Sequence, residues 1–153
     1  MSDLDLTLHR VLKAPRKLVW ECWTNPEHLK NFFVPKPHQM TEVKLDLRAG
    51  GAFCTTMLVD GTEYPNDGSY LEVVPEERLV FTDMLLAGWK PVEQPGLGFT
   101  AILTLKDHPD GTDYTAVARH ATAETAKRHS DMGFQDGWGT VASQLEDYAR
   151  GLM

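Results

Sequence analysis

The chain has 153 residues, 42% of them hydrophobic and 24% charged, with a formal net charge of −7 and a pI near 5.3. A chain of this length can bury a sizeable core as one domain. The acidic balance and the scattered Lys and Arg argue against nucleic-acid binding, which needs a concentrated basic surface. No stretch approaches the ~20 apolar residues of a membrane span, and the polar first ten residues do not resemble a signal peptide.

The first part of the chain predicts a strand followed by two short helices. Residues 4–13 alternate between leucine and polar side chains, which is typical of a strand. Pro15 suits the first turn of a helix. Asn25 is expected to cap a second helix, with Pro26 at its first position. Residues 34–39 contain two prolines and are expected to form a loop.

The middle of the chain predicts strands in hairpin succession. Their expected ranges are 42–48, 53–59, 63–74, 78–86, 99–106 and 114–120. Asp60-Gly61 and Asp110-Gly111 are strong hairpin turns, and the Asn-Asp-Gly sequence at 66–68 predicts a bulge. The Gly- and Pro-rich segment 87–96 holds an isolated Trp89, which is either folded back onto the sheet edge or exposed.

The C-terminal segment predicts one long helix that Thr122 can cap and that runs to about Arg150. Its apolar residues recur at spacings of four and three and so share one face. They are Phe134, Trp138, Val141, Leu145, Tyr148 and Leu152. Beside them runs a ridge of small residues, Ala126, Ser130, Gly133 and Gly137. Glycine inside a helix costs about 1 kcal/mol relative to alanine, so this ridge indicates either close packing on the sheet or room for a cavity.

This order of elements predicts a single α+β domain over residues 1–153, in which an antiparallel sheet wraps around the long C-terminal helix. The two cysteines, Cys22 and Cys54, lie inside segments of regular periodicity. We expect them to be reduced and buried, and the protein to be cytoplasmic. The six histidines form no HExxH pattern. Neither cysteine has a metal-ligand neighbour at a useful spacing, so we expect no metal and no cofactor.

Several motifs, in this order along the chain, carry a family resemblance. They are Ala14-Pro15 followed by Val19-Trp20, Asn25-Pro26-Glu27, Leu47-Arg48-Ala49-Gly50-Gly51, Gly68-Ser69-Tyr70 leading to Pro75-Glu76-Glu77-Arg78-Leu79, and Gly133-Phe134 with Gly137-Trp138. Together they resemble the C-terminal-domain family of activators of the heat-shock-protein-90 ATPase, within the START-like, polyketide-cyclase and lipid-transport superfamily. The resemblance extends from about Leu6 to Tyr148.

That resemblance implies a START-like helix-grip fold, with a curved antiparallel sheet of about six or seven strands and a hydrophobic cavity beneath the long helix. It implies no single activity and no catalytic residue. The residues expected to line the cavity are Trp20, Trp23, Phe33, Phe53, Tyr70, Phe81, Phe99, Ala118, His120, Phe134 and Trp138. Each can equally be ordinary core, but together they fit an apolar pocket with few polar groups.

The polar candidates are Arg48, Glu63, Asp67, Arg119 and His120. A structural interpretation stands beside the functional one. His120 shares a strand face with Ala118, so it points either into the cavity or into solvent at the strand end, and the second is favoured. Arg48 is expected in an ion pair at its turn. Glu63 and Asp67 share a face and can form an acid–base pair, but a solvated pair is favoured.

Three functions remain open from the sequence. The first is the binding of a hydrophobic or amphipathic small molecule in the cavity, without covalent chemistry. The second is a co-chaperone-like regulator that acts on a chaperone through its surface, with Trp89 as a contact. The third is a cyclase- or dehydratase-type enzyme, which needs at least two polar side chains that converge inside the pocket. The sheet edges and the Trp89 loop also allow a homodimer.

Overall fold

The computed structural model describes residues 4–93, 95 and 97–153, so residues 1–3 and Gln94 and Gly96 of the predicted 87–96 loop lie outside the described residues. The elements in chain order are β1 (Asp5–Leu12), α1 (Arg16–Thr24), α2 (Pro26–Leu29), β2 (Gln39–Leu45), β3 (Ala52–Val59), β4 (Thr62–Val74), β5 (Arg78–Thr82), β6 (Leu85–Leu86), β7 (Lys90–Pro91), β8 (Phe99–His108), β9 (Gly111–His120), α3 (Ala123–Asp131) and α4 (Phe134–Gly151).

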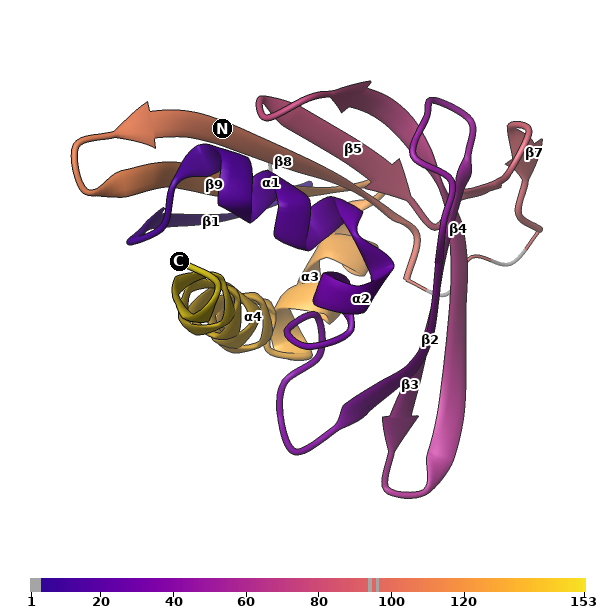
Figure 1. The fold of residues 1–153 in the computed structure, drawn as a ribbon. Helices are drawn as coiled ribbons and strands as arrows, with labels where there is room; N and C mark the ends of the chain where they lie inside the picture. Colours follow the sequence, from indigo (N-terminus) through magenta and orange to yellow (C-terminus); the bar gives the residue numbers. More distant parts are fainter. Residues whose placement is uncertain (1–3, 94, 96) are drawn as a thin grey trace.

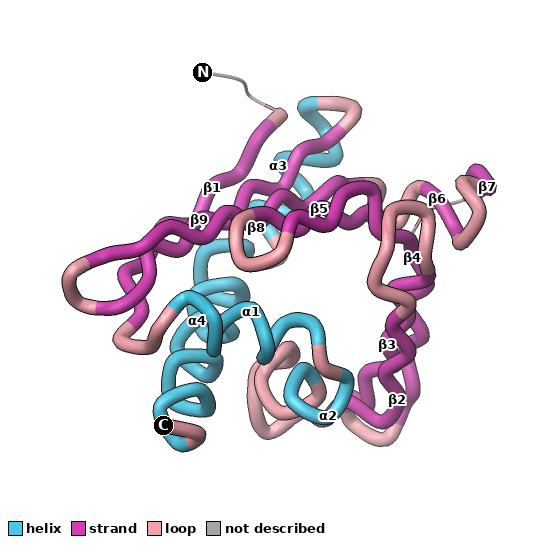
Figure 2. The backbone as a smooth tube through the Cα atoms, turned by 45° about the horizontal axis from the view of Figure 1, so that its top comes forward, coloured by secondary structure: helices cyan, strands magenta, loops and turns pink. Residues whose placement is uncertain are grey.

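One antiparallel sheet of seven strands, in the order β1-β9-β8-β5-β4-β3-β2, bends around the helices (Figure 1). Its two wings are β1-β9-β8 and β4-β3-β2, with β5 between them, and β6 and β7 form a separate small hairpin. Seen as a tube, α1 and α2 lie across the opening between the wings (Figure 2). α4 packs against β1 and α1, while α2 packs against α1 and β2. The predicted α+β helix-grip architecture is thus confirmed.

The β9 strand shows how the sequence builds the inner face of the sheet. Tyr114, Ala116, Ala118 and His120 alternate along the strand, and each is at most 6% exposed. The residues between them are partly buried or exposed, because side chains of a strand point alternately to the two faces. The inward alanines are small and therefore leave space for the helices to approach.

The predicted turn and cap residues take the positions that their chemistry favours. Asp60 and Gly61, both with positive φ, join β3 to β4. The Asn25 side chain accepts a hydrogen bond from the backbone at the start of α2, with Pro26 in the first turn. Thr122 likewise accepts from a backbone N–H at the start of α3.

The C-terminal segment is two helices, not the single helix predicted. α3 ends at Asp131, and Gly133 precedes α4 with a φ of 92°. This left-handed conformation favours glycine because it has no Cβ. Gly133 is therefore a break between helices and not a small residue inside one. Gly137 does lie inside α4, where an added Cβ would meet no atom within 4 Å. The predicted apolar stripe lies along α4 from Phe134 to Tyr148, whereas Leu152 follows the helix and is 42% exposed.

Two details of the sheet also differ from the prediction. The bulge in β4 is at Leu71, because the register shifts between Tyr70 and Glu72. Residues 66–68, where it was expected, remain paired with β3. The predicted strand 78–86 is shorter, since β5 ends at Thr82 and the next two-residue strand belongs to the small hairpin.

Candidate ligand-binding site

Six aromatic side chains form what we call the core aromatic cluster, between α1–α2 and the inner face of β3, β4 and β5. They are Trp23, Phe32, Phe33, Phe53, Tyr70 and Phe81. Neighbouring ring centroids lie 4.4 to 6.0 Å apart, and the closest pair, Phe53 and Phe81, is stacked. Most of the other pairs meet edge to face, an arrangement that aromatic rings prefer. The rings therefore fill much of the space that the ribbon leaves between the wings.

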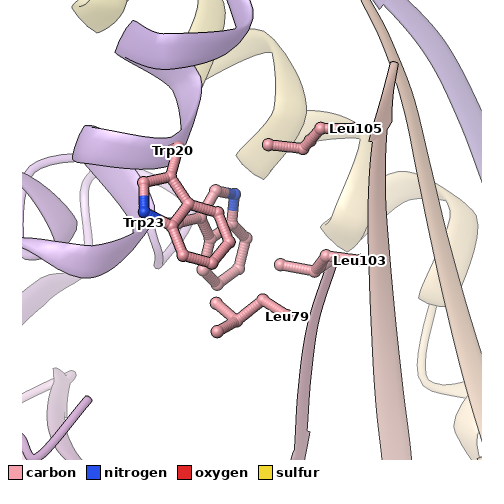
Figure 3. A pocket seen from close by; sticks show the side chains of 5 residues that line it. All are labelled: Trp20, Trp23, Leu79, Leu103 and Leu105. Atoms are coloured by element: carbon pink, nitrogen blue, oxygen red, sulfur yellow. The ribbon is translucent and has the colours of Figure 1, made fainter. Parts of the chain in front are cut away.

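A small apolar void lies beside this cluster. It is lined by Trp20, Trp23, Leu79, Leu103 and Leu105 and has a volume of about 10 Å³. The two tryptophans reach from α1 toward the three leucines of the sheet (Figure 3). A single water needs about 10–15 Å³, and pockets for drug-sized ligands have about 300–1,000 Å³. The void is too small for such a ligand, and a ligand at this position would have to displace side chains.

One buried polar group in the core aromatic cluster has no hydrogen-bond partner among the described residues. It is the hydroxyl of Tyr70, a residue that is 0% exposed. Burial raises the pKa of Tyr70, so this group is a neutral hydroxyl that can donate a hydrogen bond. A buried hydroxyl left unpaired costs about 1–3 kcal/mol. The Tyr70 hydroxyl is thus an unpaired polar group inside an otherwise apolar space.

A second set of rings, which we call the histidine cluster, lies where β9 meets α3 and α4. It consists of Phe99, His120, His129, Phe134 and Trp138, with centroids 5.1 to 6.3 Å apart. His120 is only 6% exposed, so the favoured prediction of a solvent-exposed histidine is wrong. The prediction failed because α3 folds back over the strand end and covers the ring.

The two histidines form one chain of hydrogen bonds. His120 Nδ1 lies 2.8 Å from the backbone oxygen of Leu4, and His120 Nε2 lies 2.9 Å from His129 Nδ1. A carbonyl only accepts, so His120 Nδ1 carries a proton and donates to Leu4, while His120 Nε2 and His129 Nδ1 share the second hydrogen bond. The chain joins the start of β1, the end of β9 and α3, and its polar atoms stabilise the fold.

The environment of His129 keeps that ring uncharged. Burial and, to a smaller extent, neighbouring His120 lower its pKa to about 4, while Asp83 opposes the shift. His129 is therefore neutral at neutral pH. Its position nine residues after His120, across a strand-to-helix turn, is a pairing that apolar periodicity does not reveal.

The eleven predicted lining residues do not surround one pocket. Trp23, Phe33, Phe53, Tyr70 and Phe81 belong to the core aromatic cluster, Phe99, His120, Phe134 and Trp138 belong to the histidine cluster, Trp20 lines the void, and Ala118 is buried on β9. The prediction missed the three leucines of the void. The alternating inward positions of β5 and β8 are the signal that could have identified them.

The remaining polar candidates lie on the surface. Arg48 contacts Asp46 at 2.8 Å across its turn, as predicted. Glu63 and Asp67 are exposed on β4, and Arg119 is an exposed residue near the end of β9. Among the described residues, the polar convergence that an enzyme would need is thus not formed by this set.

Trp89 satisfies both interpretations offered for it. Its ring lies over Gly50, where an added Cβ would come within 2.6 Å of the indole. The Gly88 N–H also donates to the Gly50 carbonyl at 2.9 Å. Trp89 is nevertheless 60% exposed, with a φ of 61°. The side chain is therefore held in place by the turn at Gly50 and still presents much of its surface to solvent.

The described residues contain no group of three or more His, Cys, Asp or Glu side chains that could hold a metal ion. None of the described helices combines the length and apolar character needed to cross a bilayer. Cys22 and Cys54 are free, the first buried and the second half-buried. Burial raises the pKa of Cys22 to about 11, so it is a thiol at neutral pH rather than a nucleophilic thiolate.

The curved sheet closed around α4 places the protein in the START-like class. Within that class, the chain belongs to the family described as "Activator of Hsp90 ATPase homolog 1-like protein", whose sequence model matches residues 13–150. This match confirms the resemblance carried by the motifs. No protein of curated function matches the sequence significantly.

Solved structures of similar proteins share the fold along almost the whole chain. Protein NE0264 from Nitrosomonas europaea is 42% identical, with a TM-score of 0.95 over 99% of this chain and 97% of that one. Protein Ms6760 from Mycobacterium smegmatis is 27% identical, with a TM-score of 0.83 over 99% and 94%. An AHSA1-like protein from Aeromonas hydrophila, at 16% identity and a TM-score of 0.74 over 97% and 93%, shows the fold alone.

Proposed function

We propose that the protein binds an uncharged, hydrophobic or amphipathic small molecule between the sheet and the helices, within the core aromatic cluster. The observation that carries this proposal is the Tyr70 hydroxyl, which is fully buried and has no partner among the described residues. Buried polar groups are normally hydrogen-bonded, and each exception calls for an explanation. A ligand atom that accepts a hydrogen bond from Tyr70 supplies one.

The chemistry around Tyr70 defines the class of ligand. The cluster and the neighbouring void contain no charged side chain, which disfavours a charged ligand in this interior. Stacked rings such as Phe53 and Phe81 favour a flat or aromatic body. A carbonyl or ether oxygen on that body would accept from the Tyr70 hydroxyl. The ligand is therefore a neutral apolar molecule with at least one hydrogen-bond acceptor.

Uptake of such a molecule requires the interior to open, because the void holds only about 10 Å³. Apolar ligand surface removed from water contributes about 25 cal/mol per Å². That gain has to exceed the cost of separating rings that now contact one another. We therefore expect moderate affinity and a measurable conformational step.

Fluorescence titration with prodan, a neutral naphthalene ketone, tests this proposal. We expect saturable binding with a blue-shifted emission, and a Tyr70→Phe variant that binds about 3- to 10-fold more weakly because one hydrogen bond is lost. Tyr64→Phe is the matched control, since Tyr64 is 50% exposed on the same strand. Absence of saturable binding, or equal affinity in both variants, would contradict a site at Tyr70.

A second candidate function is regulation of a chaperone ATPase through the Trp89 surface. The exposed indole held against Gly50 favours it, since exposed tryptophans often anchor protein contacts. The test is the ATPase rate of a purified Hsp90-class chaperone with increasing amounts of this protein. Stimulation that Trp89→Ala abolishes and Tyr64→Ala preserves would support it. A flat response to the wild-type protein would remove it.

A further inference from the structure

We propose that residues 26–38, which comprise α2 and the loop that follows it, are a lid over the core aromatic cluster, and that side-chain hydrogen bonds from α4 hold this lid closed. We call this segment the flap. The inference rests on the proposed function, because a lid has a purpose only if the interior admits a ligand. It identifies the element that has to move for entry.

The first group that holds the flap closed is the side-chain amide of Gln144 on α4. Its Nε2 donates to the backbone oxygens of Phe32 and Val34, each at 2.9 Å. Its Oε1 accepts from the backbone N–H of Lys36, also at 2.9 Å. One side chain thus binds three backbone groups of the flap. These groups would otherwise have no regular secondary structure to satisfy them.

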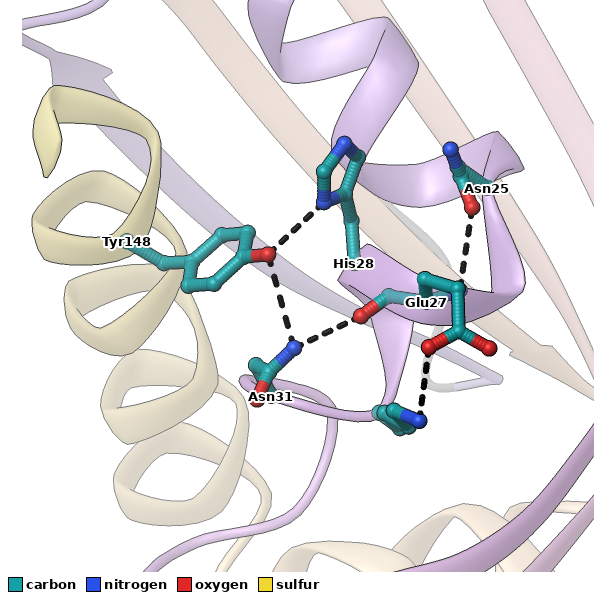
Figure 4. Close-up of polar contacts among 6 residues, drawn as sticks. Asn25, Glu27, His28, Asn31 and Tyr148 are labelled. Carbon is teal, nitrogen blue, oxygen red and sulfur yellow. Dashed lines mark hydrogen bonds and ion pairs between the residues drawn. The ribbon is translucent and has the colours of Figure 1, made fainter. Parts of the chain in front are cut away.

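The second group that holds the flap closed is the hydroxyl of Tyr148, one helical turn further along α4. The Tyr148 hydroxyl is 2.7 Å from His28 Nδ1 and 3.4 Å from Asn31 Nδ2 (Figure 4). Asn31 also donates to the backbone oxygen of Glu27 at 2.6 Å. Gln144 and Tyr148 are four residues apart and therefore lie on the same face of the helix. Together they form a polar seam between α4 and the flap.

The underside of the flap covers the proposed binding region. Phe32 and Phe33 both contact Trp23, with ring centroids 5.5 and 5.1 Å away, and Phe33 also contacts Phe53. Lifting the flap would remove these two rings from the cluster. It would expose the route to the rings around Tyr70, because Phe53 is the ring between Phe33 and Tyr70.

The other elements around the interior are more firmly held. β3, β4, β5 and β8 are joined to one another by continuous antiparallel pairing, and α4 packs against both β1 and α1. The flap has a helix of only four residues and a loop outside the strand pairing. Segments with few regular backbone hydrogen bonds open at lower free energy than core strands. Opening at the flap is therefore the route that disturbs least structure.

Hydrogen exchange measured on the unliganded protein tests the lid directly. In Gln144→Ala we expect the backbone amides of residues 32–34 and 36 to exchange at least about tenfold faster, with amides of β8 and β9 unchanged. Gln135→Ala is the matched control on the same helix, because the Gln135 side chain donates to Thr7 on β1 and not to the flap. Uniform acceleration throughout the chain, or no acceleration in the flap, would overturn the proposal.

Stopped-flow mixing with prodan tests whether the lid controls entry. Gln144→Ala and Tyr148→Phe should each raise the association rate several-fold, whereas Gln135→Ala should not change it. Tyr148→Phe keeps the ring and removes only the hydroxyl, so it serves if Gln144→Ala does not fold. If the wild type binds no prodan, the proposed function fails and hydrogen exchange alone decides the lid. Binding at an unchanged rate in both variants would overturn the lid and leave the function standing.

Discussion

The two aromatic clusters of the interior differ in how their polar atoms are satisfied. In the histidine cluster, His120 and His129 form a chain of hydrogen bonds that ends on the Leu4 carbonyl. In the core aromatic cluster, the Tyr70 hydroxyl has no hydrogen-bond partner among the described residues. Both regions are buried and ring-rich, so burial and composition alone do not distinguish them.

This difference separates a structural role from a binding role. A satisfied polar chain ties elements together and needs nothing further to explain it. An unpaired hydroxyl costs stability in the unliganded protein, and a ligand can recover that cost.

The largest expected effect is the loss of a ring from the core aromatic cluster. Phe53→Ala should lower the free energy of unfolding by about 3–5 kcal/mol, because Phe53 contacts Phe33, Tyr70 and Phe81 and its removal leaves a cavity. Urea unfolding followed by tryptophan fluorescence measures this change. A loss below about 1 kcal/mol would mean that the cluster is loosely packed already.

The next largest effect is a pH dependence of the stability of the folded protein, which arises in the histidine cluster. The pKa of His129 is about 4 in the folded protein and about 6.5 in an unfolded chain. Between these values the unfolded state binds more protons, so stability falls as the pH drops from about 6.5 to about 4 and is fully present above that window. The total loss should be about 3 kcal/mol.

Unfolding curves at a series of pH values measure this dependence, and two histidine variants assign it. His129→Phe should flatten the slope in this window, whereas His38→Phe, at a half-exposed loop position, should preserve it. If His129→Phe retained the full slope, the dependence would belong to other groups, and a buried neutral His129 would be the wrong description.

The sequence predicted the fold well because local signals agreed with one another. The alternation in β9, the Asp60-Gly61 turn and the caps at Asn25 and Thr122 each correspond to a physical preference that the structure satisfies. The helix break at Gly133 was missed for a physical reason. The apolar stripe keeps its phase in α4, so periodicity does not register a change of direction just before it.

Two glycine substitutions test the helix break at Gly133, and we expect them to change the free energy of unfolding by about 1 kcal/mol in opposite directions. Gly133→Ala should destabilise by about 1 kcal/mol because a Cβ is strained at a φ of 92°. Gly137→Ala should stabilise by about 0.5–1 kcal/mol, because Gly137 lies inside α4 and a Cβ there meets open space. Thermal unfolding of both variants measures the pair. Equal signs would contradict the two-helix geometry.

The candidate site was less predictable than the fold. The aromatic residues were identified correctly as a group, but their division into two clusters depends on how α3 folds back over β9. The flap is held by hydrogen bonds between its backbone and the Gln144 side chain, and these partners are more than a hundred residues apart in the sequence. Local sequence predicts neither the unpaired Tyr70 hydroxyl nor the hydrogen bonds of Gln144 to the flap, because both depend on tertiary packing.

The most direct test of a ligand position at Tyr70 compares stability and binding in a single variant. Tyr70→Phe should have a free energy of unfolding about 1 kcal/mol higher than the wild type in urea titrations, because it removes an unpaired buried hydroxyl. The same variant should bind prodan more weakly. A ligand-binding site at Tyr70 therefore predicts that this variant is more stable than the wild type and binds prodan more weakly. A variant that is less stable than the wild type and binds prodan equally well would show that Tyr70 serves only the core.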